Sequence, residues 1–259
     1  MTTSPQNDAA IAFRGVSYRF ANGNELLNDL NLQVRRGETL VLLGRSGSGK
    51  TTTLKLINAL AIPTEGEVQV EGRATTKWDP IRLRRGIGYV IQDAGLFPHF
   101  TVQRNIGLVP TIEEWPAERV AQRVSELLQL VGLGASLANR YPRELSGGQR
   151  QRVGVARALA ADPPILLMDE PFGALDPITR AELQREFLAL QKRLQKTVVF
   201  VTHDLREALL LGTRIALMEA GRLVAALAPE EFTKSTDPMV MKYLDAFGAP
   251  RSNGNRGPA

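Results

Sequence analysis

A glycine-rich loop at residues 44–51 constrains the fold more than any other feature of the sequence. Its sequence is GRSGSGKT; the apolar stretch 39–43 precedes it, and an amphipathic stretch, 51–60, follows. The spacing fits G-x-x-x-x-G-K-[ST], in which glycines let backbone N–H groups turn toward phosphate oxygens. A helix that leaves such a loop adds the positive end of its dipole at the same point. The loop therefore predicts a nucleotide site within a strand–loop–helix unit.

Separate residues of this loop have separate expected roles. Lys50 is expected to reach the β- and γ-phosphates, and the Thr51 hydroxyl is expected to ligate Mg²⁺. The expected ligands of this loop are therefore a nucleotide and Mg²⁺. The expected nucleotide-binding residues here are Gly44, Ser46, Gly47, Gly49, Lys50, Thr51 and Thr52.

Two acids end a second apolar stretch, because Asp169 and Glu170 follow residues 165–168. Ligands of an open parallel sheet lie at the carboxyl ends of its strands, so we expect both acids near the phosphates. Asp169 is expected to hold Mg²⁺ through water, and Glu170 is expected to act as general base toward the attacking water. For the pair alone, a solvated strand end is the alternative. His203 follows a third apolar stretch, 198–201; it is predicted either to contact the γ-phosphate and the water or to cap or pack.

The order of strands and helices predicts an α/β fold. Short β-rich segments at 11–18, 30–34, 39–43, 67–70 and 88–91 are interrupted by one helix, from Lys50 to before Pro63. Residues 115–160 become helical, most clearly at 117–130. Apolar strands at 165–168 and 198–201 then alternate with helices at 178–194 and 205–211. This alternation is typical of a mostly parallel sheet with helices on both faces.

Composition excludes several classes of function. The 259 residues include no cysteine and two histidines, which excludes disulfides, thiol catalysis and cysteine metal sites. The net charge of +5 comes from scattered arginines, so we expect a generic basic surface and no nucleic-acid partner. We find neither a signal peptide nor an apolar run of the roughly 18–20 residues that span a bilayer. The chain is expected in the cytoplasm unless a partner holds it at a membrane, with residues 1–9 and 249–259 disordered.

A second glycine-rich segment, LSGGQ at residues 145–149, precedes a predicted helix at 150–161. Ser-Gly-Gly at a helix N-terminus is either another anion-binding element or a helix cap. Two phosphate-binding ends in one chain favour a dimer in which they meet.

With these segments in this order, residues 11–235 resemble the nucleotide-binding subunits of ABC transporters. The resemblance implies that the cofactors are ATP and Mg²⁺, that Phe20, rather than Tyr18, stacks on adenine and that Gln92 touches Mg²⁺ and the attacking water. It also implies that residues 145–149 bind the γ-phosphate held by the other subunit, that residues 174–176 cross the dimer interface, and that His203 is the switch histidine. The site residues that it adds are Phe20, Gln92, Ser146, Gly147, Gly148, Gln149 and Asp176.

The implied fold is a P-loop NTPase (RecA-like) with an N-terminal antiparallel β subdomain and an inserted α-helical signature subdomain. The ATPase domain is expected to span residues 10–248, with the helical subdomain at about 93–160. The implied partners are a second copy or a paralogous ATPase subunit, a transmembrane permease and, indirectly, an extracytoplasmic solute-binding protein. These partners imply a peripheral position on the cytoplasmic face of the inner membrane.

A finer resemblance is to importer ATPases for quaternary ammonium osmoprotectants such as glycine betaine, choline and carnitine. It is carried by QDAGLFPHFTV at residues 92–102, by Asn105 and Ile106, by LVP at 108–110 and by MDEPFGALDP at 168–177. The pair Gln92-Asp93 departs from the Gln-Gln that is more often expected. Because the sequence ends soon after Leu244, we expect no paired C-terminal regulatory domains.

Three interpretations stay open from the sequence. Leu96, Phe97 and Phe100 are expected to form a groove for a short helix of the membrane subunit, with core packing as the alternative. The solute is either an osmoprotectant or another compound such as an amino acid, an oxyanion or a lipid. A soluble ABC ATPase that acts on ribosomes or DNA is disfavoured by the single set of motifs and by the lack of sustained heptads.

Overall fold

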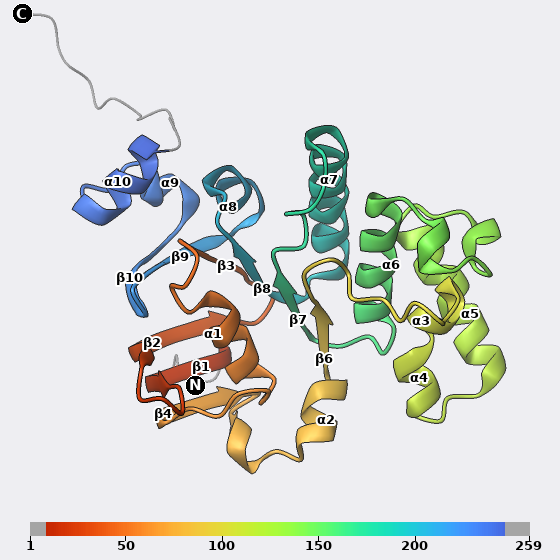
Figure 1. Ribbon diagram of the computed structural model, residues 1–259, viewed down its shortest axis with the longest axis horizontal. Coiled ribbons are helices and arrows are strands. Elements are labelled where there is room, and N and C mark those ends of the chain that lie inside the picture. The colour runs from red at the N-terminus through yellow and green to blue at the C-terminus, as the bar shows by residue number, and fades with distance from the viewer. Residues whose placement is uncertain (1–8, 247–259) are drawn as a thin grey trace, which may run out of the picture.

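The computed structural model describes residues 9–246, which form two sheets and the helices around them (Figure 1). The segments predicted to be disordered lie outside the described residues, except for Ala9, which begins the first strand. The strands are β1 (Ala9–Arg19), β2 (Glu25–Arg35), β3 (Thr39–Gly44), β4 (Glu65–Val70), β5 (Arg73–Ala74), β6 (Ile87–Val90), β7 (Ile165–Asp169), β8 (Thr197–Thr202), β9 (Arg214–Glu219) and β10 (Arg222–Leu227). The α-helices are α1 (Lys50–Ile57), α2 (Pro80–Arg85), α3 (Val102–Ile106), α4 (Leu108–Ile112), α5 (Ala117–Leu130), α6 (Gly147–Leu159), α7 (Pro177–Leu194), α8 (Leu205–Leu211), α9 (Pro229–Phe232) and α10 (Pro238–Ala246). Short 3-10 helices occur at η2 (Thr75–Lys77), η3 (Ala135–Leu137) and η4 (Pro142–Glu144).

The larger sheet has six strands in the order β10-β9-β3-β8-β7-β6. The strands from β9 to β6 run parallel, and β10 pairs antiparallel with β9 at one edge. All residues of β3, β7 and β8 are buried, as expected for central parallel strands covered on both faces. The carboxyl ends of these three neighbouring strands therefore lie together at one edge of the sheet.

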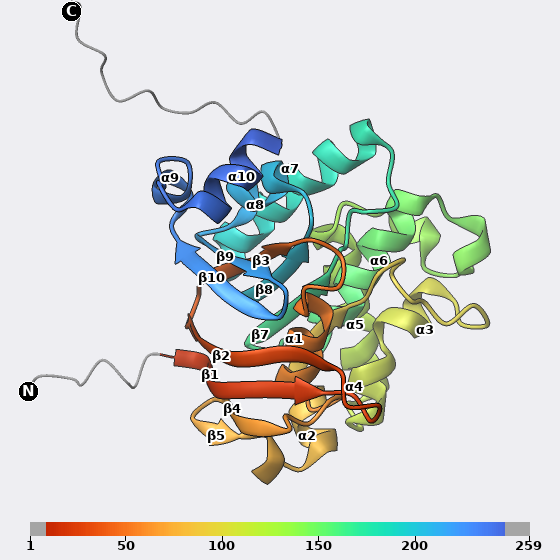
Figure 2. The ribbon, with the colours of Figure 1, turned by 60° about the vertical axis from the view of Figure 1, so that its left-hand side comes forward.

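Strand β3 separates two hydrophobic cores. Leu40 and Leu42 face a core with α1 and strands of the antiparallel sheet β2-β1-β4-β5, which lies beside α1 (Figure 2). Val41 and Leu43 face the opposite core, built with α6, α7 and α8. Successive side chains of a strand point to opposite faces, so one short apolar strand serves both cores. The end of β3, and the loop that follows it, is thus fixed from two sides.

The chain between β6 and β7 forms a helical region that extends from the sheet (Figure 1). Its helix α5 has the predicted bounds and buries Val124, Leu127 and Leu128 on one face. The predicted fold class is confirmed: a mostly parallel sheet, an antiparallel β part and inserted helices. No helix among residues 9–246 is both long enough and apolar enough to cross a membrane.

Several boundaries differ from the prediction. Helix α1 ends at Ile57 rather than before Pro63, because Ala59 is left-handed and the Asn58 side chain accepts from the Leu60 N–H. Strand β6 ends at Val90, and left-handed residues follow from Asp93, so Gln92 lies beyond the strand. Strands β9 and β10 and the short helices α2, α3, α4, α9 and α10 were not predicted.

Candidate functional site

The glycine-rich loop joins β3 to α1 and requires glycine at particular points. A Cβ at Gly44 would lie 2.4 Å from the carbonyl oxygen of Met218 in β9. Gly49 has a φ of 96°, and a Cβ there would lie 2.4 Å from the Leu27 side chain. The backbone therefore passes close to both neighbouring sheets at these two points, which leaves no room for a side chain. Gly47 lies in the loop between them and is also left-handed.

Lys50 begins α1, and its side chain returns to the loop. Its Nζ donates to the carbonyl oxygens of Gly44 and Arg45, each at 2.8 Å. Burial lowers the pKa of Lys50, while the carboxylates of Glu170 and Asp169 raise it. The ammonium group is thus held beside the loop backbone and close to both acids, where it can contact an anion held by the loop.

Thr51 and Asp169 bring two oxygen atoms together next to Lys50. The Thr51 hydroxyl donates to Asp169 Oδ1 at 3.0 Å, from the first turn of α1 to the end of β7. Burial raises the pKa of Asp169, and the Thr51 hydrogen bond acts in the opposite direction. A hydroxyl and a carboxylate are ligands that hard divalent cations prefer, so this pair fits Mg²⁺. Thr52 follows in the same turn and is half-buried.

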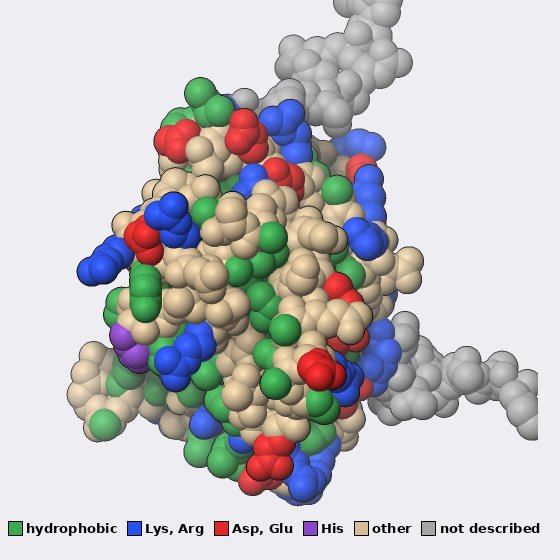
Figure 3. Space-filling model, turned by 90° about the vertical axis from the view of Figure 1, so that its right-hand side faces the viewer, with side chains coloured by type: hydrophobic (Ala, Val, Ile, Leu, Met, Phe, Trp, Pro, Cys, Tyr) green, Lys and Arg blue, Asp and Glu red, His purple; other side chains and the backbone are tan. Residues whose placement is uncertain are grey.

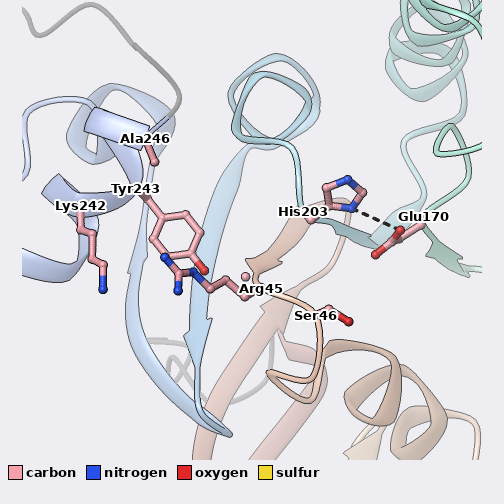
Figure 4. Close-up of a pocket in the computed structure, with 8 residues that line it drawn as sticks. Arg45, Ser46, Glu170, His203, Lys242, Tyr243 and Ala246 are labelled. Carbon is pink, nitrogen blue, oxygen red and sulfur yellow. Dashed lines mark ion pairs between the residues drawn. The ribbon is translucent and has the colours of Figure 1, made fainter.

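Glu170 and His203 face each other across the ends of β7 and β8. Glu170 Oε2 lies 3.3 Å from His203 Nδ1, as the dashed line in Figure 4 shows. Glu170 has a φ of 45°, and its N–H donates to the Val201 carbonyl at 3.0 Å. A non-glycine residue in the left-handed region is strained, and such strain clusters at functional sites. The strained backbone turns the carboxylate toward the imidazole of the neighbouring strand end.

A cleft of about 500 Å³ joins this pair to the glycine-rich loop (Figure 4). Helix α10 forms its far wall, where the Tyr243 hydroxyl donates to Glu219 Oε2 at 3.2 Å. Burial raises the pKa of this Tyr243 hydroxyl, with the Glu219 charge acting in the same direction. The contribution of α10 was not predicted, because nothing local in its sequence marks it. The lining residues are Gly44, Arg45, Ser46, Glu170, His203, Lys242, Tyr243 and Ala246.

The segment 145–149 has the structure of a helix cap. Ser146 is the N-cap of α6: its Oγ accepts from the Gln149 N–H at 3.2 Å, and Gln149 Oε1 accepts from the Ser146 N–H at 2.9 Å. Gly147 and Gly148 form the first turn, and a Cβ at Gly148 would lie 2.7 Å from the Thr179 side chain. The beginnings of α6 and α7 are therefore in close contact. In the described part of the chain, none of residues 146–149 lines the cleft at the glycine-rich loop.

Asp176 caps the neighbouring helix α7. Its Oδ1 accepts from the N–H groups of Thr179 at 3.0 Å and Ile178 at 3.2 Å. Hydrogen bonds from Thr179 lower the pKa of Asp176. A smaller cleft, of about 150 Å³, connects Glu170 with this surface through Gly147 and Ala174. Glu170 thus lines both clefts, and Gly147 in the first turn of α6 lines the smaller one.

Gln92 and Phe20 do not line the main cleft among the described residues. Gln92 is exposed two residues beyond β6, and the pairing of Val90 with Met168 brings this strand end beside Asp169 and Glu170. Phe20 follows β1 and is 46% exposed, with its ring edge-on to Tyr18 at 5.6 Å. An exposed ring is available for stacking. The roles of both residues stay predictions.

Comparisons with known proteins agree with this geometry. The model of the family described as "ABC transporter" matches residues 27–173. The choline transport ATP-binding protein OpuBA of Bacillus subtilis is 49% identical over 235 residues, which is 90% of this chain and 62% of that protein. The glycine betaine uptake system ATP-binding protein YehX of Escherichia coli is 50% identical over 83% of this chain and 69% of its own length. The chain thus spans less than two thirds of the Bacillus relative.

A solved structure gives the same result for the fold. The dimeric, post-hydrolysis state of the ATP-binding cassette MJ0796, bound to ADP and phosphate, superposes with a TM-score of 0.75 at 36% identity. The match covers 85% of this chain and 98% of that one.

Proposed function

The chain belongs to the ABC transporter family, and on that premise we propose that it binds and hydrolyses ATP to drive an importer of quaternary ammonium osmoprotectants. The single observation that best supports hydrolysis is the Glu170–His203 pair, which faces the cleft of the glycine-rich loop. The solute class is supported by the relatives named for choline transport and glycine betaine uptake.

ATP is the proposed substrate, with its phosphates held by the N–H groups of the glycine-rich loop and by Lys50. Thr51 and Asp169 would hold Mg²⁺, since their oxygen atoms are already 3.0 Å apart, and Gln92 would be a further ligand. Mg²⁺, when bound, would neutralise charge that develops on the phosphate oxygens. Phe20 would stack on the adenine.

Glu170 is the proposed general base, because its carboxylate lies at the end of β7 and faces the open cleft. It would accept a proton from the attacking water, while His203 hydrogen-bonds the water and the γ-phosphate. The 3.3 Å contact with Glu170 keeps the exposed imidazole at the rim of the cleft.

A second copy, or a paralogous subunit, is proposed to complete the site. In the described residues, the capped segment with Ser146, Gly147, Gly148 and Gln149 does not line the cleft of its own chain. Helix N-termini bind anions, so this segment would contact the γ-phosphate held by the partner, with Asp176 beside the interface. The dimeric form of the MJ0796 cassette supports this arrangement.

A transmembrane permease is proposed to dock beside Phe97, which is 41% exposed. The segment is held in shape by Asn105, whose Nδ2 donates to the carbonyl oxygens of Phe97, Phe100 and Thr101. Hydrophobic side chains reach the surface between charged ones on the helical side of the molecule (Figure 3). Leu96, Phe97 and Phe100 would receive a short helix of the permease, which places the chain on the cytoplasmic face of the membrane and links it to a solute-binding protein. Phe97→Asp should then abolish uptake and leave ATP binding intact; unchanged uptake would refute the docking site.

The hydrolysis proposal is tested with Glu170→Gln. Removing a general base costs roughly 10²- to 10⁴-fold in turnover, whereas the loop and Lys50 are untouched. We therefore expect bound ATP and an accumulated ATP-dependent dimer, measured by nucleotide retention and size-exclusion chromatography. Glu182→Gln, at an exposed position of α7, is the matched control and should retain full turnover. Normal turnover in Glu170→Gln would remove Glu170 as the base.

The solute is tested by uptake of labelled glycine betaine at high osmolarity, in cells that carry the native chain or Glu170→Gln. Uptake that depends on Glu170 would support importer and solute class together. Equal uptake in the two strains would remove the osmoprotectant proposal; amino acids, oxyanions and lipids would then be screened with the same pair.

A further inference from the structure

The Glu207 carboxylate is buried near the site and has no part in the proposed chemistry. It lies in the first turn of α8 and is 5% exposed. A buried carboxylate is costly unless hydrogen bonds satisfy it. Glu207 Oε2 accepts from the Thr202 hydroxyl at 2.6 Å, and Oε1 accepts from Gln184 Nε2 at 3.0 Å. Both partners are buried as well, so the three side chains form a closed polar cluster inside the protein.

The Thr202 end of this cluster fixes the turn that carries His203. Besides donating to Glu207, the Thr202 hydroxyl accepts from the Asp204 N–H at 3.0 Å. One hydroxyl therefore ties the residue before His203 to the residue after it. The His203 side chain is 62% exposed, so surrounding packing contributes little to its position. Its placement depends on the contact with Glu170 and on the backbone that Thr202 and Glu207 hold.

The Gln184 end of the cluster belongs to α7, the helix that follows the loop after Glu170. One turn earlier in α7, Arg180 donates to the carbonyl oxygens of Leu175 at 3.0 Å and Gly173 at 3.3 Å. Burial raises the pKa of Glu207, and the Thr202 hydrogen bond and the Arg180 charge act in the opposite direction. The Glu207 carboxylate thus contacts Thr202 at the end of β8 and Gln184 in α7, and the Arg180 side chain of α7 is bonded to the loop that follows Glu170.

We propose that Glu207 is a positioning residue that holds the turn of His203, through Thr202, in register with the Glu170 loop, through α7. The inference rests on the proposed ATP hydrolysis. Glu207 touches neither the cleft nor the reacting groups in this arrangement; it acts through the backbone on either side. A misplacement of about 1 Å at a reacting group costs on the order of 100-fold in rate, so a cluster that sets this geometry affects turnover strongly.

The test compares disruptive and conservative changes at both ends of one hydrogen bond. Thr202→Val removes the hydroxyl at nearly constant volume, whereas Thr202→Ser retains it. Glu207→Ala removes the carboxylate. Glu207→Gln keeps one acceptor for Thr202 and offers its amide N–H to Gln184, whose side chain can turn to accept. Glu182→Ala, at an exposed position of the same α7, is the control.

The measurements are kcat for ATP hydrolysis, the Kd for a fluorescent ATP analogue and the midpoint of thermal unfolding, all on the full chain. We expect Thr202→Val and Glu207→Ala to lower kcat by about 10- to 100-fold, while the Kd stays within about twofold, since the loop and Lys50 are unchanged. Thr202→Ser and Glu207→Gln should recover kcat to within about threefold of the unmodified chain, because the hydrogen bonds persist. If Glu207→Ala does not fold, the positioning role is judged from Thr202→Val alone.

Each other outcome overturns a specific statement. Unchanged kcat in folded Thr202→Val overturns the positioning role, and so does a Kd that rises in parallel with the loss of kcat. Failure of Thr202→Ser and Glu207→Gln to recover turnover also overturns it, because the hydrogen bonds would then not be the cause. Absence of ATP hydrolysis in the unmodified chain overturns the proposed function itself, and this inference with it.

Discussion

The glycine-rich loop at residues 44–51 and the segment at 145–149 have similar compositions but different structures. Both are glycine-rich, contain serine and lead into a helix. In the first, two sheets press against the backbone, and Lys50 extends its ammonium group along the loop. In the second, Ser146 and Gln149 are occupied in a capping box. The first segment lines a cleft with Glu170 and His203 in its own chain. The second does not line that cleft in the described residues, and its proposed contact with phosphate requires a partner subunit.

The largest expected effect is at Lys50. Lys50→Ala removes a buried cation that contacts the loop carbonyls, and loss of such a preorganised group costs about 100- to 1000-fold in turnover. Nucleotide affinity should fall as well, measured by titration with a fluorescent ATP analogue. Lys192→Ala, at an exposed position near the end of α7, should change neither quantity. If Lys50→Ala retained its turnover, the loop at residues 44–51 could no longer be distinguished from residues 145–149 as the phosphate site of its own chain.

The next effect is on stability and separates the glycines of the two segments. Gly44→Ala places a Cβ against the Met218 carbonyl, so we expect a loss of about 1–3 kcal/mol in the free energy of unfolding. A Cβ in Gly147→Ala would meet the Leu175 side chain at 3.5 Å and the Arg150 side chain at 3.9 Å, both ordinary contacts, so stability should change by about 0.5 kcal/mol or less. Urea unfolding of both variants measures the difference. Equal losses of unfolding free energy in Gly44→Ala and Gly147→Ala would show that the backbone of residues 145–149 is as tightly constrained as that of the loop.

A smaller effect separates a cap from an anion site at Ser146. Ser146→Asp preserves a good N-cap, so the thermal midpoint should stay within about 2 °C of the unmodified chain. The negative charge of Asp at this position would repel the γ-phosphate held by the partner subunit. ATP-dependent dimerisation and turnover should therefore fall by about tenfold. Thr101→Asp, at the N-cap of α3, is the matched control and should leave both intact. If Ser146→Asp dimerised as well as the unmodified chain, Ser146 would be only the N-cap of α6 and not part of an anion site.

The smallest expected effect concerns the pH dependence of the α7 cap. Hydrogen bonds from Thr179 lower the pKa of Asp176 below its ordinary value of 3.8. The stability that the Asp176 carboxylate contributes is therefore fully present above pH 3.8. It is lost as pH falls through the lower pKa that Asp176 has in the folded protein. Asp176→Asn keeps a capping oxygen without a titrating charge, so its urea midpoint should fall less between pH 5 and acid than that of the unmodified chain. If the urea midpoint fell equally in both proteins on acidification, Asp176 would not contribute to the pH dependence of stability.

The sequence predicted the parts of the fold whose signals are local. Helix α5 has the predicted bounds because its apolar residues recur at helical spacing. Most of β3, β7 and β8 was recognised because the runs 39–43, 165–168 and 198–201 are almost entirely apolar. Strand β10 was missed because it lies at an edge and is only partly buried, so its pattern is weak. The end of α1 was misplaced because the break depends on the Asn58 side chain.

The candidate site was predictable where each residue follows its own strand. Asp169 and His203 follow apolar runs closely, and Lys50 follows one through the glycine-rich loop; the rule for parallel sheets places such ends together. The strand order β3-β8-β7 does not follow from chain order, so the direct contact between Glu170 and His203 could not be predicted. The wall formed by Tyr243 depends on contacts between distant parts of the chain, which no local pattern records.

The position of β3 has a consequence for how the protein is made. The glycine-rich loop leaves the ribosome early, but both hydrogen-bonded neighbours of β3 are β8 and β9, which begin at Thr197 and Arg214. Until those residues are synthesised, the apolar segment TLVLLG has no strand to pair with and remains liable to aggregation. Binding of ATP by a growing chain is therefore expected only after most of it has been translated, which makes nucleotide capture a late marker of correct folding during synthesis.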